Sequence, residues 1–283
     1  MHKTKPSWIL LALLGFIVLG ALLAPFLPLL DPNRQDLANT FARPLLFGGS
    51  LEHPLGTDSL GRDMLSRLAY GARFSILIAL CGAVLSGIFG TALGIAVGLV
   101  GGWFDAVVSR LTEAQLALPF MLLAAALIVS QGQSLTNLVL VLALYGWAPF
   151  TRVVRAEVMS LRSRPWVLGL RVAGMSQTRI MVRHLLPSVV GSVVVIGTLQ
   201  VGFMILGESA LSFIGLGVVA PDVSWGLMLA EGRSYMTHAW WMATLPGLAI
   251  ALFVILVNLS GDALRQQFDP RRKVSIRVQT PSS

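Results

Sequence analysis

The sequence predicts an all-α integral membrane protein with six transmembrane helices. Hydrophobic residues make up 55 % of the 283-residue chain and charged residues only 12 %, whereas soluble domains have about 25 % charged residues. So few charges cannot solvate the surface of a soluble protein of this length. The apolar residues also lie in long runs, and about 20 of them in a helix cross the hydrocarbon layer of a bilayer. We attribute the net charge of +8 to Lys and Arg in cytoplasmic loops rather than to nucleic-acid binding.

Six nearly uncharged segments are the predicted transmembrane helices. The first is longer than the apolar region of a signal peptide, about 7–15 residues, and lacks a small-residue cleavage site, which favours an uncleaved helix over a signal peptide. The third and fourth are short, and residues 131–134 are predicted to form a tight turn between them. The six segments are residues 8–30, 74–100, 114–129, 135–150, 185–206 and 239–259.

The distribution of basic residues predicts the orientation of these helices. Cytoplasmic loops of membrane proteins carry an excess of Lys and Arg. Most of the 21 Lys and Arg residues fall on the cytoplasmic side if the N-terminus is cytoplasmic, so both termini are expected there. The predicted parts are an N-terminal tip with the first helix (1–30), an external segment of short turns and one short helix (31–72), a helical core (73–265) with a basic cytoplasmic loop (152–184), and a cytoplasmic tail (266–283).

Small residues recur at every fourth position of the second predicted helix. In lipid, helices pack through close approach of their backbones at such residues, as in the G-x-x-x-G pattern. The pattern favours packing against another helix of the same chain, and a seam with a second protein is the alternative. The residues of this row are Gly82, Ser86, Gly90, Gly94 and Gly98.

The basic cytoplasmic loop contains a predicted two-turn helix. Pro165 stands where a helix can begin, because a proline in the first turn loses no hydrogen bond. Gly174 stands where the helix can end, because glycine adopts the left-handed C′ conformation without strain. Such a helix fits equally an interfacial helix on anionic lipid and a docking element for a partner protein. Between its ends lie Trp166, Val167, Leu168, Gly169, Leu170 and Arg171.

Catalytic and metal-binding patterns are absent from the sequence. The chain has no phosphate-binding G-x-x-x-x-G-K-[ST] motif, no Cys/His spacing typical of a metal site, and no serine with a paired base. Glu208 lies at the outer end of the fifth predicted helix. A carboxylate near membrane depth is a functional candidate, but we expect Glu208 to cap a helix end or to pair with an arginine. The sequence therefore predicts no catalytic residue, no metal site and no cofactor in this chain.

The cytoplasmic loop resembles that of the inner-membrane permease family of bacterial ATP-binding-cassette importers. The hallmark of this family is an E-A-A triplet, three residues, a glycine, and further along an apolar residue followed by Leu-Pro. Here Gly174 and Leu185-Leu186-Pro187 match that pattern. The E-A-A triplet is replaced by Leu168-Gly169-Leu170, which puts the details of loop docking in doubt but not the identity of the loop.

Further motifs resemble the second permease of the dipeptide, oligopeptide and nickel importers. They lie before the second helix (residues 53–73), between the fifth and sixth helices (211–226 and 246–248) and at the C-terminal end (258–270). The resemblance covers nearly the whole chain. It implies a type I importer permease fold, with an outer N-terminal helix and a five-helix permease core in the bacterial cytoplasmic membrane.

The resemblance also implies a division of labour among several subunits. A sister permease would complete the pathway through the lipid, and two cytoplasmic ATPase subunits would carry ATP and Mg²⁺. The helix at residues 165–174 would be the coupling helix, seated in a groove of one ATPase. An external binding protein would deliver dipeptides or short oligopeptides, and nickel or a metal–chelate complex is the alternative substrate. The chain itself would then not be an enzyme. The residues expected at the external gate or the binding-protein contact are Asp58, Arg62, Asp63, Glu208 and Trp225.

Two other functions compete with the importer hypothesis. A self-sufficient secondary transporter is disfavoured because the sequence has no evident inverted repeat and no charged residue at a helix centre for ion coupling. A membrane enzyme is disfavoured because no nucleophile has a base on the same side of the membrane.

Overall fold

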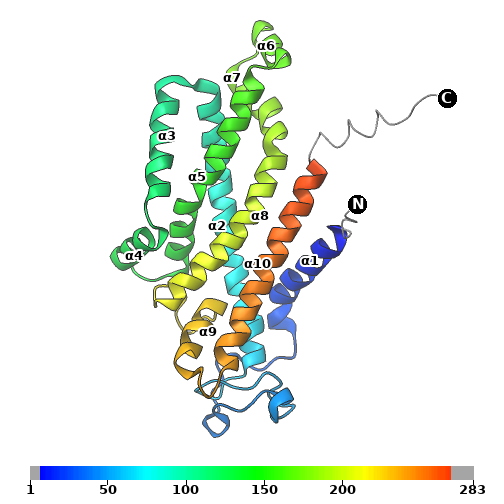
Figure 1. Cartoon of the computed structure of the whole chain (residues 1–283), viewed down its shortest axis with the longest axis vertical. Helices are drawn as coiled ribbons and strands as arrows, with labels where there is room; N and C mark the ends of the chain where they lie inside the picture. The colour runs from blue at the N-terminus through cyan, green and yellow to red at the C-terminus, as the bar shows by residue number, and fades with distance from the viewer. Residues whose placement is uncertain (1–6, 269–283) are drawn as a thin grey trace, which may run out of the picture.

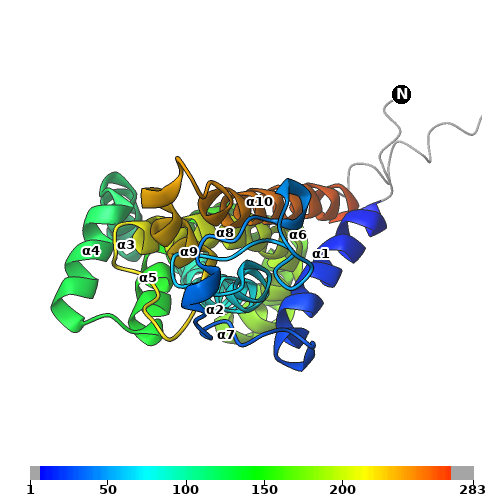
Figure 2. The same ribbon diagram turned by 90° about the horizontal axis from the view of Figure 1, so that it is seen from below.

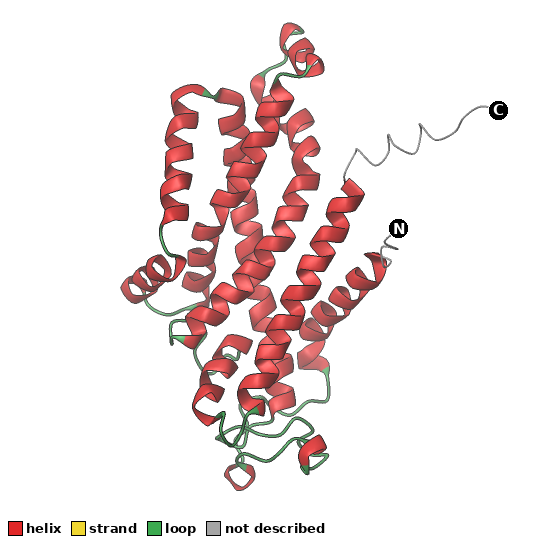
Figure 3. Cartoon of the chain, in the orientation of Figure 1, coloured by secondary structure: helices red, strands yellow, loops and turns green. Residues whose placement is uncertain are grey.

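The computed structural model describes residues 7–268, and within them every regular element is helical (Figure 1 and Figure 3). The tail at residues 269–283 and the tip at residues 1–6 lie outside the described residues. The long helices are α1 (Ser7–Leu23), α2 (Met64–Val100), α3 (Gly102–Ala117), α4 (Phe120–Gln131), α5 (Leu135–Arg162), α8 (Leu186–Phe213) and α10 (Trp241–Phe268). The short ones are α6 (Pro165–Val172), α7 (Gln177–Ile180) and α9 (Trp225–Gly232).

Five helices are long and apolar enough to span a membrane, which confirms the all-α membrane fold. The third predicted span is wrong as a single helix, because α3 and α4 meet at an angle of 91° and give a sixth span only as a broken pair. The break lies at Leu118, whose backbone is extended (φ −81°, ψ 132°). Pro119 follows, and a proline disfavours the helical conformation of the residue before it. The turn predicted between the third and fourth segments is present between α4 and α5.

Four helices, α2, α5, α8 and α10, are longer than their predicted apolar segments. α2 begins at Met64 and takes in the last part of the predicted external loop, so that loop ends at Asp63. The Asp63 side chain accepts a hydrogen bond of 2.8 Å from the Ser66 N–H and thereby caps the helix. α5 continues to Arg162, well beyond the predicted end at residue 150. Hydropathy marks only the part of a helix in lipid, whereas caps decide where the helix ends.

The bundle is built around α2, which packs against α5 and α8. α1 lies at the edge of the bundle against α10 and α2 (Figure 1). At one end the segment between α1 and α2 forms a cap together with α9, and at the other end α6 and α7 project beyond the bundle (Figure 1). The described ends of α1 and α10 point toward the end that carries α6 (Figure 1).

The row of small residues on α2 packs against α5 of the same chain. A Cβ atom added to Gly90 would lie 2.5 Å from the Trp147 carbonyl oxygen, and one added to Gly94 would lie 2.9 Å from the Thr151 carbonyl oxygen. The Thr151 hydroxyl donates a hydrogen bond of 3.0 Å to the Gly90 carbonyl oxygen. This row is therefore an intrachain interface, and the alternative of a seam with a second protein is wrong for it.

The rest of the row follows the same course. A Cβ atom on Gly98 would lie 2.7 Å from Val158, and one on Gly82 would lie 3.4 Å from Leu142. The Ser86 hydroxyl donates a hydrogen bond of 2.7 Å to the Gly82 carbonyl oxygen. The polar group of this side chain is therefore paired within the apolar interface. Close packing along several helical turns makes α2 and α5 one rigid unit.

Candidate functional site

The helix α6 begins and ends where the sequence predicts. Arg164 precedes it with an extended backbone, and Pro165 occupies the first turn. At the other end Gly174 has a φ of +78°. The Gly174 N–H donates to the Arg171 carbonyl oxygen at 3.0 Å, and the Met175 N–H donates to the Leu170 carbonyl oxygen at 3.1 Å. These two bonds form a Schellman motif, which requires a left-handed residue at the position of Gly174.

One face of α6 is anchored and most of the helix is exposed. Val167 is fully buried in an apolar cluster with Val158 of α5 and Leu185. Trp166 is 43 % exposed, Leu168 48 % and Val172 88 %, and their spacing distributes them around the helix. Exposed apolar residues at the tip of a molecule are candidates for an interaction surface. Of the other predicted docking residues, Leu170 is half-buried, and Leu168, Gly169, Arg171 and Gly174 are exposed.

The segment after α6 passes directly into a membrane helix. α7 continues through one π-helical turn (Met181–Leu185) into α8. Pro187 lies in the first turn of α8 rather than in α6. A displacement of α6 therefore reaches α8 through one short turn, and reaches α5 through the buried Val167.

At the opposite end of the bundle, a fully buried carboxylate holds several elements together. Glu208 is a residue of α8, and it is 0 % exposed. It accepts hydrogen bonds from the hydroxyls of Ser212 at 2.7 Å and Ser224 at 2.8 Å, and longer ones of 3.4 Å from Ser75 and Ser209. These serines come from α2, α8 and the residue that precedes α9.

The expectation that Glu208 caps a helix end or pairs with an arginine is wrong. The residue lies within α8, and its four partners in the described part of the chain are all hydroxyl groups. Each of three serines also accepts a backbone N–H, because Ser75 caps Trp225, Ser224 caps Leu227 and Ser212 accepts from Val218. Glu208 thus fixes the backbone around the start of α9 through these hydroxyls.

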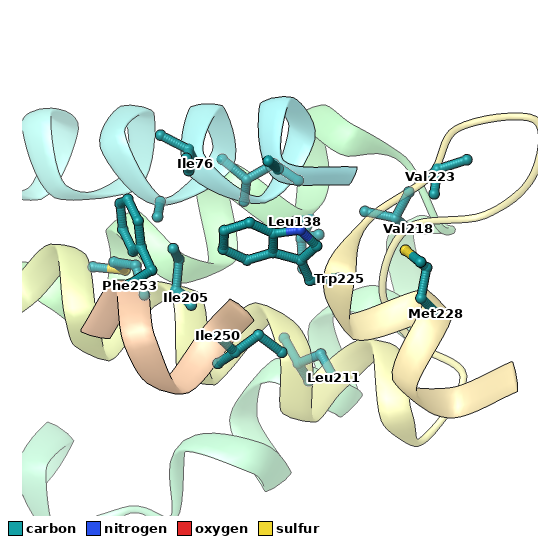
Figure 4. Packing of buried hydrophobic residues seen from close by; sticks show 14 of the residues in the cluster. Ile76, Leu138, Ile205, Leu211, Val218, Val223, Trp225, Met228, Ile250 and Phe253 are labelled. Atoms are coloured by element: carbon teal, nitrogen blue, oxygen red, sulfur yellow. The ribbon is translucent and has the colours of Figure 1, made fainter. Parts of the chain in front are cut away.

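Trp225 is the apolar counterpart of this polar centre. Its indole N–H donates to the Leu68 carbonyl oxygen at 2.9 Å. Its ring lies between Ile76 of α2 on one side and Ile250 and Leu211 on the other (Figure 4). The side chain is buried, so it contributes to packing between helices rather than to a surface contact.

An ion-pair network joins the external segment to α9. Arg62 Nε lies 2.5 Å from Asp58 Oδ2, and Arg62 also reaches Glu231 at 3.1 Å. Arg67, which is 1 % exposed, lies 2.5 Å from Glu231 and 3.4 Å from Asp58. Sequence reasoning did not select Glu231, because 164 positions separate it from Arg67 and no local pattern links them.

The structure buries all five residues predicted for the external gate or binding-protein contact. Asp63 caps α2 and lies 3.0 Å from His53 Nδ1. Asp58 and Arg62 are buried by their pairing. These side chains therefore form no surface contact in this conformation, since capping, hydrogen bonding and packing turn them inward, and their role in an external gate stays a prediction. Seen from this end, the segment between α1 and α2 crosses in front of the ends of α2 and α9 (Figure 2).

An apolar groove runs along the membrane-spanning part of α2. It has a volume of about 630 Å³ and lies between α2 and α8. Its walls carry apolar and small residues, including Val84, Ile88, Gly197 and Val201. Among the described residues, no group of three or more His, Cys, Asp or Glu side chains can hold a metal ion.

The geometry defines a class of protein: a multi-pass helical membrane protein with a capped end, an apolar groove between α2 and α8, and a short projecting helix at the other end. Comparison with known proteins gives the family. The profile described as "Binding-protein-dependent transport system inner membrane component" matches residues 90–274. The chain belongs to this family and is a multi-pass inner-membrane permease.

Curated relatives match over most of the chain. The di/tripeptide transport system permease protein DppC of Pseudomonas aeruginosa is 42 % identical, over 91 % of this chain and 85 % of that protein. The dipeptide transport system permease protein DppC of Alkalihalophilus pseudofirmus is 38 % identical, over 93 % and 86 %. The nickel transport system permease protein NikC of Escherichia coli is 37 % identical, over 95 % and 94 %.

A solved structure supports the fold. A chain of the inward-facing MetNI methionine ABC transporter aligns with a TM-score of 0.59 at 15 % identity, over 73 % of this chain and 98 % of that one. At this identity the likeness concerns the fold alone.

Proposed function

We propose that this chain is one of two permease subunits of an ATP-driven importer for dipeptides or short oligopeptides. The observation that carries the proposal is α6, a short helix with a buried anchor and exposed apolar residues, in a chain 42 % identical to a di/tripeptide permease. The family of the chain favours a docking element for a partner protein over an interfacial helix on lipid.

In this proposal one of two ATPase subunits binds α6, and ATP and Mg²⁺ reside in these subunits. Closure of the ATPases moves α6 and, through Val167 and the turn after α7, moves α5 and α8 as rigid bodies. Both termini lie in the cytoplasm with α6. The excess of Lys and Arg in residues 152–184 supports this orientation.

On the opposite side, an external binding protein docks on the cap and releases its substrate. The sister permease faces α2 and α8, and membrane lipid covers the remaining apolar surface. Opening then requires that the hydrogen bonds around Glu208 and the ion pairs of Arg67 rearrange, because both tie α9 to α2.

The alternative substrate is nickel or a metal–chelate complex. It is favoured by the 37 % identity to a nickel permease over 95 % of the chain. A permease that passes a chelate needs no metal ligands of its own, so the same architecture serves either substrate.

The first experiment is co-purification of the tagged chain from its native membrane, with mass spectrometry of its partners. The proposal predicts a sister permease, two ATPase polypeptides or two copies of one, and a binding protein. That binding protein is then tested by calorimetry against dipeptides and nickel chelates, which separates the two substrates. Recovery of the chain alone contradicts the importer and favours a self-sufficient transporter.

A further inference from the structure

A second cavity lies at the capped end of the bundle, apart from the residues already described. It has a volume of about 570 Å³ and is formed by three segments: the residues after α1, the start of α2, and the loop before α9. Small-molecule pockets span roughly 300–1,000 Å³, so a dipeptide is of the right size. The lining residues that carry charge are Asp31, Arg73 and Asp222.

A direct bond fixes two of the walls relative to each other. The Asn33 side-chain amide donates to the Pro221 carbonyl oxygen at 2.9 Å, across 188 positions of sequence. The Asn33 N–H in turn donates to Asp31 Oδ1 at 2.8 Å. These hydrogen bonds hold the segment that carries Asp31 against the loop that carries Asp222. The two carboxylates therefore belong to the same wall of the cavity.

The charges in this cavity stand apart from the ion-pair network at this end of the molecule. Asp58, Arg62, Arg67 and Glu231 are joined in one network of ion pairs. Within residues 7–268, the Arg73 guanidinium forms no ion pair and no side-chain hydrogen bond. The Asp222 carboxylate forms none with these residues either. Asp31 and Arg73 are exposed and Asp222 is half-buried, so one open cavity presents an arginine and two carboxylates that are not paired with each other.

Such a charge set fits a zwitterion. An ammonium group is stabilised by two carboxylates, and a guanidinium binds a carboxylate through two parallel hydrogen bonds. A bare divalent metal ion fits poorly, because the positive charge of Arg73 opposes it. Phe74, Leu29 and Tyr70 supply apolar surface in the same cavity for the rest of a ligand.

The cavity and the groove between α2 and α8 lie along the same face of α2. Arg73 is followed on the same face of α2 by Leu77, Leu80 and Val84, at the three- and four-residue spacing of a helix face. Leu80 and Val84 line the groove between α2 and α8. The groove therefore begins about two turns of α2 beyond Arg73.

We propose that this cavity is an entry site that binds the charged ends of a zwitterionic peptide, the ammonium at Asp31 and Asp222 and the carboxylate at Arg73. The proposal rests on the proposed import of peptides and adds the place where the permease itself first holds the substrate.

The test uses the complete transporter in proteoliposomes, with ATP inside and the binding protein loaded with radiolabelled dialanine outside. Arg73→Gln and Asp222→Asn are each expected to lower the maximal uptake rate about tenfold, as expected for loss of one charged hydrogen bond. The matched control is Arg43→Gln, which removes an exposed positive charge outside the cavity; its uptake is expected to equal that of the unchanged protein. The charge-exchanged protein, Arg73→Asp with Asp222→Arg, is expected to recover most of the uptake, because it still offers both charges to a zwitterion.

A second readout locates the ligand directly. A dipeptide that carries a benzophenone side chain is expected to crosslink to residues 70–74 of this chain under illumination, and excess dialanine is expected to prevent the crosslink. Uptake unchanged in Arg73→Gln, or absence of this crosslink during active uptake, overturns the entry site. The entry site is also overturned if Arg73→Gln and Asp222→Asn raise only the concentration of binding protein needed for half-maximal uptake. The cavity would then contact the binding protein rather than the peptide. Failure of the unchanged transporter to import any dipeptide overturns the proposed function instead.

Discussion

The hydroxyl of Ser224 donates a hydrogen bond of 2.8 Å to the buried carboxylate of Glu208 and accepts one of 3.1 Å from the Leu227 N–H. One side chain thus joins the middle of the cap to α8 and starts α9. Ser75 repeats the arrangement from α2, because it donates to Glu208 and accepts the Trp225 N–H. The position of α9 is therefore determined by a carboxylate that touches no part of α9 through its own hydrogen bonds.

The first prediction concerns this carboxylate. Glu208→Ala leaves several buried hydroxyls without an acceptor, and each such group costs about 1–3 kcal/mol. We expect a clear fall in the thermal unfolding midpoint of the purified complex. Glu208→Gln keeps one acceptor oxygen and is expected to lose less. Glu113→Gln, at a carboxylate that is 59 % exposed, is the control and is expected to leave the midpoint nearly unchanged. Equal midpoints for Glu208→Ala and this control would contradict the role of Glu208.

The second prediction concerns the contact between α2 and α5. Gly90→Ala places a Cβ atom 2.5 Å from the Trp147 carbonyl oxygen, and overpacking of this kind costs about 1–3 kcal/mol. We expect a lower unfolding midpoint and less folded protein in the membrane. Gly20→Ala is the matched control, because a Cβ atom there meets nothing within 4 Å; alanine is expected to stabilise α1 by about 0.5–1 kcal/mol. The reverse order of the two variants would show that the backbones do not approach as closely as described.

The third prediction concerns coupling. Gly174→Val forces a β-branched residue into a left-handed conformation (φ +78°), which such residues strongly disfavour. We expect the end of α6 to unwind, so that ATP hydrolysis by the assembled transporter continues while uptake falls. Gly174→Asn is the conservative variant, since asparagine tolerates this conformation, and it is expected to keep most of the coupling. A normal ratio of uptake to ATP hydrolysis in Gly174→Val would contradict the assignment of α6 as the coupling helix.

The fourth prediction concerns the ion pairs of the cap. Arg67→Met leaves the buried Asp58 carboxylate with one charged partner fewer, and breaking a buried pair costs about 3–5 kcal/mol. Glu231→Gln is expected to cost less, because its side chain is 31 % exposed and solvent screens the pair. Limited proteolysis between α1 and α2 measures both effects. We expect faster cleavage in Arg67→Met than in Glu231→Gln, and the opposite order would contradict the network.

Local signals in the sequence were sufficient for part of this structure. Pro165 and Gly174 predicted the start and the end of α6 correctly. Both signals depend only on neighbouring residues. Apolar runs identified most of the membrane helices for the same reason. They did not locate the break at Leu118, which comes from Pro119 within a run that hydropathy alone reads as continuous, nor the start of α2, which comes from the cap at Asp63.

The class of protein was therefore determined by the sequence alone: a membrane chain with a docking helix at one end and the motifs of an importer permease. The tertiary structure decided which small residues meet which helix, why Glu208 is surrounded by hydroxyls, and that Arg67 pairs with Glu231. These relationships join positions about 60 to 160 residues apart. Their partners are brought together only by packing of the helices, and no pattern of neighbouring residues encodes that packing.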